Sequence, residues 1–269
     1  MPLIRNRGVD LFYDLSGPED APAVAFSNSI GTTLEMWDRQ IPALTSRYRC
    51  LRYDTRGHGR SPTVDESVAI EDLADDLAGL LDALGLEEAH IVGLSLGGMT
   101  AQAFGQRHAT RAKSIVLMAT SAYLPHGWDE RAAIVRTKGM EAIVDPVLAR
   151  WFTPTFAADH PDVVTAFRAR FLANDARGYA ACCEAIRDMD LRPGNAGLQQ
   201  PMLIIAGADD AAPPVPMMED IRATAPQADL IVLSRAAHIL AIERADGVNR
   251  FLKALLDDVE DGRSLSPAR

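Results

Sequence analysis

Ser95 is the residue whose surroundings in this sequence most favour covalent chemistry. It lies in Gly93–Gly97, a G-x-S-x-G pattern, with the apolar strand pattern His90–Val92 before it and a helical pattern after it to about His108. The two glycines let strand and helix approach closely, so the turn holds the serine in a strained conformation. Free N–H groups at the start of the helix favour negative charge there. We therefore predict a nucleophile rather than an incidental serine in a Gly-rich turn.

A nucleophilic serine needs a general base, and the base needs an acid to orient it. In folds that use this turn, the acid and then the histidine follow the serine along the chain. Two aspartates follow an apolar strand pattern, and Asp210 is the predicted acid with Asp209 as the alternative. His238 comes just after the last strand pattern and is the predicted base, with a structural histidine as the alternative.

Two backbone N–H groups are expected to stabilise the oxyanion that forms when a serine attacks a carbonyl. The first belongs to Leu96, directly after the nucleophile. The second must come from the polar loop that follows the strand pattern Ala23–Phe26. Ile30 is the preferred donor in that loop, and Ser29 is the alternative.

The elements that must position these residues alternate between apolar runs and amphipathic helical patterns. Alternation over residues 3–16 predicts an antiparallel hairpin, and helical spacing is predicted over Trp37–Leu44, Ile70–Leu84 and Val248–Val259. The further strand patterns are Ala23–Phe26, Cys50–Tyr53, Ser114–Met118, Met202–Ala206 and Leu230–Leu233. Near-continuous apolar strands are typical of parallel sheets buried on both faces. An α/β fold is therefore predicted, with a mostly parallel, eight-stranded sheet and helices on both faces.

The interval between Met118 and Met202 breaks this alternation. It carries helical patterns and no strand-like run, and it is far longer than an ordinary connection. We predict an α/β core formed by residues 1–120 and 201–269. Residues 121–200 are predicted to form a helical cap, inserted after the sixth strand and packed over the end of the sheet where Ser95 is exposed.

Composition and charge restrict the function classes. The 269 residues are 48% hydrophobic and 24% charged, which is ordinary for one large α/β unit. The formal net charge of −10 disfavours nucleic acids and anionic membranes as partners. No apolar stretch is typical of a signal peptide or a membrane span, and the three cysteines have no metal-ligand spacing. We expect a cytoplasmic protein, and the sequence leaves open whether it forms a homo-oligomer.

The motifs resemble those of the α/β-hydrolase superfamily, and within it the 3-oxoadipate enol-lactonases of bacterial aromatic-compound degradation. The segments that carry the resemblance are Phe26–Trp37, Leu51–Gly59, Gly93–Met99, Arg150–Thr153 and Gly178–Ile186. Leu96 departs from the methionine usual in that family, and the residues after His238 lack its polar Ser-Asn.

The resemblance implies a serine hydrolase that opens a small, carboxylate-bearing enol-lactone through an acyl-enzyme, as in the β-ketoadipate pathway. It implies no metal ion and no organic cofactor. The partner would be a small anionic lactone or ester.

The charge distribution bears on how such an anion could be recognised. Residues 121–200 carry 9 Lys/Arg and 10 Asp/Glu, whereas the rest of the chain carries 18 and 27. The cap is thus the least repulsive route to Ser95, and an arginine in it could bind a carboxylate bidentately. Arg150, next to Trp151, is the first candidate and Arg131 the second. The alternative is that both are solvated surface arginines.

Two rival functions use the same fold. A general carboxylesterase or a perhydrolase-like enzyme would employ the same three catalytic residues. A non-catalytic ligand-binding protein is disfavoured, because the serine, acid and histidine are all present in order. Turnover of any simple ester would exclude the binding protein.

Overall fold

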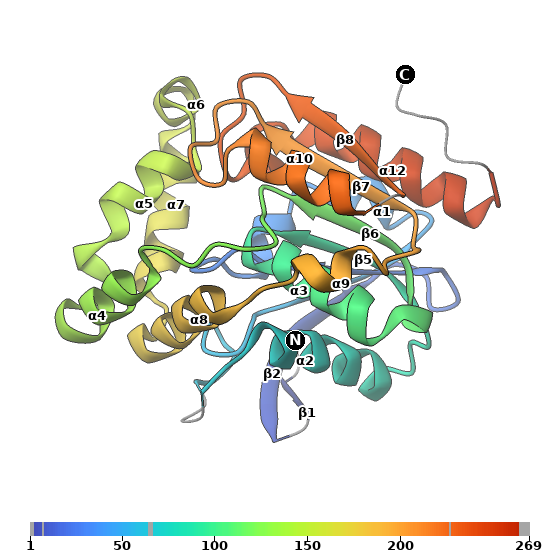
Figure 1. Cartoon of the computed structure of the whole chain (residues 1–269), viewed down its shortest axis with the longest axis horizontal. Coiled ribbons are helices and arrows are strands. Elements are labelled where there is room, and N and C mark those ends of the chain that lie inside the picture. Colours follow the sequence, from blue (N-terminus) through green and yellow to red (C-terminus); the bar gives the residue numbers. More distant parts are fainter. Residues whose placement is uncertain (1–2, 7, 64–66, 226, 264–269) are drawn as a thin grey trace.

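The computed structural model describes residues 3–6, 8–63, 67–225 and 227–263. Its centre is an eight-stranded sheet in the order β1-β2-β4-β3-β5-β6-β7-β8 (Figure 1). The strands are β1 (Leu3–Asn6), β2 (Val9–Ser16), β3 (Ala23–Ser27), β4 (Arg49–Tyr53), β5 (Ala89–Leu94), β6 (Ala112–Met118), β7 (Met202–Gly207) and β8 (Ala228–Leu233). β1 pairs antiparallel with β2, as does β2 with β4, and all later neighbours pair in parallel. The predicted fold class is confirmed.

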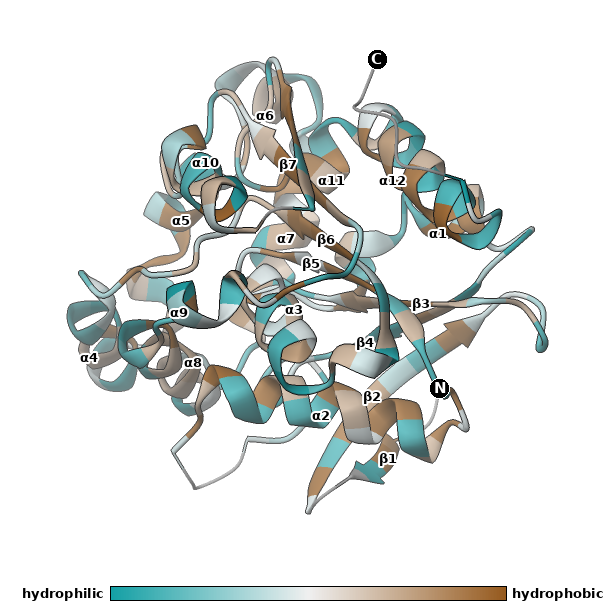
Figure 2. Cartoon of the chain, turned by 45° about the vertical axis from the view of Figure 1, so that its right-hand side comes forward, coloured by the Kyte–Doolittle hydropathy of each residue, from teal (hydrophilic) through white to brown (hydrophobic). Residues whose placement is uncertain are grey.

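Helices cover both faces of the sheet, which explains why its central strands are mostly apolar. Every residue of β3, β5 and β7 is buried, and Figure 2 shows these strands as a hydrophobic centre between mixed helices. α2 and α3 pack against each other on one face, whereas α1 and α12 lie on the other (Figure 1). Outside the interval between β6 and β7, the helices are α1 (Ile41–Leu44), α2 (Ile70–Ala83), α3 (Leu96–Arg107), α10 (Val215–Thr224), α11 (Leu240–Glu243) and α12 (Ala245–Glu260), with 3₁₀ turns over Leu34–Trp37 and Ala109–Arg111.

The prediction of one helix over residues 37–44 is wrong in its extent. A 3₁₀ turn ends at Trp37, and α1 begins only at Ile41, with Pro42 in its first turn. Proline favours a helix start, because its missing N–H is not needed there. Gln40 lies between the 3₁₀ turn and α1, and its Nε2 donates a hydrogen bond to the Ala241 carbonyl at 2.8 Å. The residues that separate the two elements are thus held by a distant part of the chain.

Only helices and turns connect β6 to β7, an interval in which every residue is described. They are α4 (Trp128–Lys138), a 3₁₀ turn (Met140–Ala142), α5 (Val144–Trp151), α6 (Pro154–Asp159), α7 (Pro161–Leu172), α8 (Ala176–Asp188) and α9 (Arg192–Asn195). Figure 1 shows α4 to α8 gathered at one end of the sheet. The division into a core and a separate cap stays a prediction, and "cap" is used below for residues 121–200.

Within the described ranges, no helix combines the length and the apolar composition that crossing a bilayer requires.

Candidate active site

Ser95 occupies the tight turn between β5 and α3. Its backbone has φ 57° and ψ −116°, a region that residues with a side chain rarely adopt. Two hydrogen bonds hold this conformation: the Ser95 amide donates to the Met118 carbonyl, and the Thr120 hydroxyl donates to the Ser95 carbonyl, both at 2.8 Å. The end of β6 and the residues that follow it therefore hold Ser95 in a strained conformation, of the kind that gathers at functional sites.

The two glycines of the motif are required by close backbone contacts. A Cβ on Gly93 would lie 1.9 Å from the carbonyl oxygen of Gly97, and one on Gly97 would lie 2.0 Å from that of Ser27. No side chain fits either position without moving the backbone. The spacing predicted from the sequence thus has a steric cause, and it brings the loop after β3 against the start of α3.

His238 and Asp210 form a buried pair. Nδ1 of His238 lies 2.8 Å from Oδ2 of Asp210, and the other carboxylate oxygen accepts a hydrogen bond from the Ala212 amide at 2.9 Å. Asp210 is 5% exposed, whereas Asp209 is exposed. The carboxylate fixes which ring nitrogen carries the proton and leaves Nε2 to act as a base. Asp210, and not Asp209, therefore contacts the histidine.

Ser95 and His238 line one small cavity, of about 70 Å³. The loop after β7 contributes Ala212 and Pro213, and the core adds Ile30 and Met99. The cap residues that line it are Leu124, Trp128, Arg131, Val147, Arg150, Trp151 and Tyr179. The structure thus brings together the predicted nucleophile and base with all three predicted cap residues.

The geometry favours Ile30 over Ser29 as the second oxyanion donor. The Ser29 amide already donates to the Met36 sulfur at 3.4 Å, whereas no acceptor is recorded for the Ile30 amide in the described part of the chain. Leu96 is the first residue of α3, so its amide has no partner within the helix. Both amides are available to a ligand atom near Ser95.

Arg131 and Arg150 bring two positive charges to the cavity. Neither guanidinium forms an ion pair within the described chain, and that of Arg131 lies over the Trp128 ring, 5.0 Å from its centre. Burial, and then the charge of Arg131, lower the pKa of Arg150 from its ordinary value. Two arginines that repel each other and lack a carboxylate favour binding of an anion.

The chain resembles known proteins along nearly its whole length. A family model described as the alpha/beta hydrolase fold matches residues 22–245. A 3-oxoadipate enol-lactonase of Acinetobacter baylyi is 36% identical over 92% of this chain and 93% of its own, and a second from that organism is 39% identical over 77% and 79%. The crystal structure of the enol-lactonase from Burkholderia xenovorans LB400 has a TM-score of 0.93 and 39% identity, covering 95% of this chain and 100% of that one.

The chain belongs to the 3-oxoadipate enol-lactonase family of the α/β-hydrolases. The predicted family is confirmed, and the chain is an enzyme, a hydrolase of carboxylic ester bonds. Among the described residues of this hydrolase, no group of three or more His, Cys, Asp or Glu side chains is placed to hold a metal ion.

Trp151 links the cap of this hydrolase to the loop that carries His238. Its buried ring makes edge-on contacts with Phe167 and Phe171, at centroid distances of 6.0 and 5.5 Å. Its carbonyl accepts a hydrogen bond from the Ile239 amide at 2.9 Å. The residue is therefore both a cavity wall and part of the packing of the cap.

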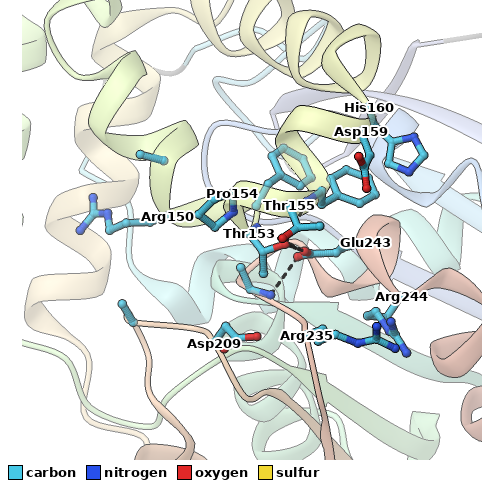
Figure 3. Close-up of a pocket in the computed structure, with 15 residues that line it drawn as sticks. Arg150, Thr153, Pro154, Thr155, Asp159, His160, Asp209, Arg235, Glu243 and Arg244 are labelled. Atoms are coloured by element: carbon cyan, nitrogen blue, oxygen red, sulfur yellow. Dashed lines mark hydrogen bonds between the residues drawn. The ribbon is translucent and has the colours of Figure 1, made fainter.

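Glu243 strengthens the same junction between the cap and the loop that carries His238 (Figure 3). Its carboxylate accepts hydrogen bonds from the Ala237 amide at 2.9 Å, the Thr153 amide at 3.2 Å and the Thr153 hydroxyl. It borders an outer cleft of about 550 Å³ that shares Arg150 with the cavity at Ser95 but is lined by neither Ser95 nor His238. Glu243 and Ala237 face the outer cleft, whereas Trp151 and His238 line the cavity at Ser95.

Two residues at this site have no distinctive signal in the sequence. Tyr179 belongs to the segment 178–186 that carries the family resemblance, but a tyrosine in an amphipathic helix is ordinarily a core residue. Glu243 lies on a short helix without any motif. Only the fold places Tyr179 in the cavity, and only the fold brings Glu243 into contact with both Thr153 of the cap and Ala237.

Proposed function

We propose that this enzyme hydrolyses 3-oxoadipate enol-lactone to 3-oxoadipate, with Ser95, His238 and Asp210 as its catalytic residues. One observation carries the proposal: a small cavity joins Ser95 and His238 to two arginines that pair with no carboxylate in the described ranges of the chain. The two positive charges beside Ser95 suit an ester that bears a negative charge. The names of the relatives that span most of the chain support the same substrate.

The first half of the reaction forms an acyl-enzyme. His238 Nε2 takes the proton of Ser95 as Oγ attacks the lactone carbonyl carbon. The tetrahedral oxyanion accepts hydrogen bonds from the Leu96 and Ile30 amides, which are fixed in place before the reaction starts. Collapse of this intermediate breaks the ring C–O bond and expels an enolate that stays attached to the acyl group. The proton held by His238 passes to the enolate, and the enol tautomerises to the ketone, which prevents the ring from closing again and leaves His238 neutral for the second half.

The second half releases the product. His238 takes a proton from a water molecule, whose oxygen attacks the acyl carbon, and the proton returns to Ser95 Oγ as the ester bond breaks. Overall, one water molecule and one lactone monoanion give the dicarboxylate and one proton. The Asp210 carboxylate stabilises the imidazolium that forms in each half.

A side-by-side comparison of kcat/KM for the enol-lactone, neutral lactones and p-nitrophenyl esters tests the proposal. We expect the enol-lactone to exceed the neutral compounds by at least a hundredfold. Equal values for the enol-lactone and neutral esters would contradict it and favour a general carboxylesterase. No turnover of any ester would exclude the catalytic residues as well.

A further inference from the structure

The hydroxyl of Tyr179 is a buried hydrogen-bonding group without a partner. The residue lies on α8, is fully buried and lines the catalytic cavity. Its hydroxyl has no hydrogen-bond partner in the described chain. A buried hydroxyl without a partner costs free energy, and such groups are rare in folded proteins. An unsatisfied hydroxyl at a ligand cavity suggests that a ligand atom supplies the missing partner.

Neighbouring residues fix the position of the Tyr179 ring. The ring lies edge-on to Phe171, with centroids 5.5 Å apart. A Cβ on Gly31 would lie 2.6 Å from the Phe171 ring and 3.0 Å from the Tyr179 ring, so the loop after β3 packs directly on both. The start of α8 is held as closely, because a Cβ on Gly178 would lie 2.5 Å from the Cα of Gly57. The hydroxyl is therefore held rigidly.

The cavity that Tyr179 lines also holds two charged hydrogen-bond donors, the guanidinium groups of Arg131 and Arg150. Burial raises the pKa of Tyr179 above its ordinary value, although the nearby charges of Arg131 and Arg150 oppose the shift. The phenol therefore stays protonated at neutral pH and can donate. With the two guanidinium groups it forms a set of donors, which matches the several acceptor positions of a carboxylate.

We propose that Tyr179 determines specificity by donating a hydrogen bond to the carboxylate of the substrate, beside Arg131 and Arg150. This inference rests on the proposed function only in requiring an anionic ester. It assigns the cap three contacts to the anion and explains why the buried hydroxyl has no partner among the residues that the structure describes.

Two esters that differ by one carboxylate test the inference without using the lactone. Mono-p-nitrophenyl adipate carries a terminal carboxylate, and p-nitrophenyl hexanoate has a methyl group in its place. We expect Tyr179→Phe to lower the adipate-to-hexanoate ratio of kcat/KM about tenfold, the effect of losing one hydrogen bond to a charged group. Tyr48→Phe is the matched control, because Tyr48 is equally buried but bonds Asp257 at 2.7 Å, far from the cavity.

Melting temperatures of the free enzymes give a second, independent result. Tyr179→Phe removes a hydroxyl that has no hydrogen-bond partner in the described chain, so Tm should stay equal or rise. Tyr48→Phe loses the hydrogen bond to Asp257, so Tm should fall. A ratio that changes less than threefold in Tyr179→Phe would overturn the inference. So would a variant that fails to fold, because the hydroxyl would then have a structural partner. If the wild-type enzyme prefers the adipate ester but does not open the enol-lactone, the proposed function fails and the inference stands.

Discussion

At the scale of single residues, the contact between His238 and Asp210 distinguishes Asp210 from its neighbour Asp209. We expect Ser95→Ala, His238→Ala and Asp210→Asn each to lower kcat by about a thousandfold or more, because these residues act as a unit. The matched control is Asp209→Asn, an exposed neighbour that should retain wild-type activity. Steady-state kinetics on the enol-lactone, with circular dichroism to check folding, measures both. An inactive Asp209→Asn beside an active Asp210→Asn would reverse the assignment.

The two cavity arginines make a second prediction at this scale. Arg150→Met and Arg131→Met should each raise KM for the anionic ester, and lower its kcat/KM relative to the neutral ester, by about ten- to a hundredfold. A charged partner in a partly dry cavity contributes more than it would in water. The control is Arg136→Met, which lies on the same helix as Arg131 but pairs with Glu184 at the surface. If neither cavity variant changes the ratio of the two esters, neither arginine binds the carboxylate.

At the scale of elements, the junction between cap and histidine loop depends on Glu243. Glutamine has one acceptor oxygen where glutamate has two, so Glu243→Gln must lose the hydrogen bond from either the Ala237 amide or the Thr153 amide. We expect kcat to fall about tenfold for the anionic and the neutral ester alike, since a loosened histidine loop misplaces the base for any substrate. The arginine variants, in contrast, should change the ratio of kcat/KM between the anionic and the neutral ester.

Kinetics on the same pair of esters therefore separates positioning from recognition. Glu219→Gln, an exposed change on α10, serves as the control for a lost surface charge. An unchanged kcat in Glu243→Gln would show that the Trp151–Ile239 hydrogen bond alone holds the junction.

At the scale of the whole molecule, a buried histidine links acid stability to the packing of α12 on the sheet. His90 lies on β5, with Nδ1 2.7 Å from Ser114 Oγ and Nε2 2.9 Å from Glu260 Oε1 at the end of α12. Burial lowers the pKa of His90 from 6.5 to about 4, although Glu260 opposes this shift. Between about pH 6.5 and pH 4, His90 is therefore protonated in the unfolded chain but not in the folded one. The free energy of unfolding falls as the pH is lowered through this range, because protons bind preferentially to the unfolded state.

This loss should be smaller in His90→Gln than in the wild type. Tm measured at intervals from pH 7 to pH 4 gives the comparison. His126→Gln is the control, because His126 is exposed and its replacement should leave the wild-type slope. Identical slopes in wild type and His90→Gln would assign the acid sensitivity to other groups.

The sequence by itself determined what depends on local pattern. The strand before Ser95, the glycines at Gly93 and Gly97 and the order of serine, acid and histidine follow from short segments, because a tight turn and a buried strand each need particular residue types within a few positions. The apolar runs predicted the sheet for the same reason. The family could be recognised from such segments as well.

Only the tertiary structure decided between neighbours and joined distant residues. Asp209 and Asp210 have the same side chain, and the bend that turns one toward His238 depends on contacts of the loop after β7. Glu243 meets Thr153 across 90 positions of the chain. Tyr179 enters the cavity because α8 packs on the loop after β3. Contacts between segments far apart in the chain leave no periodic pattern in the sequence, so these roles emerge only when the cap lies over the sheet.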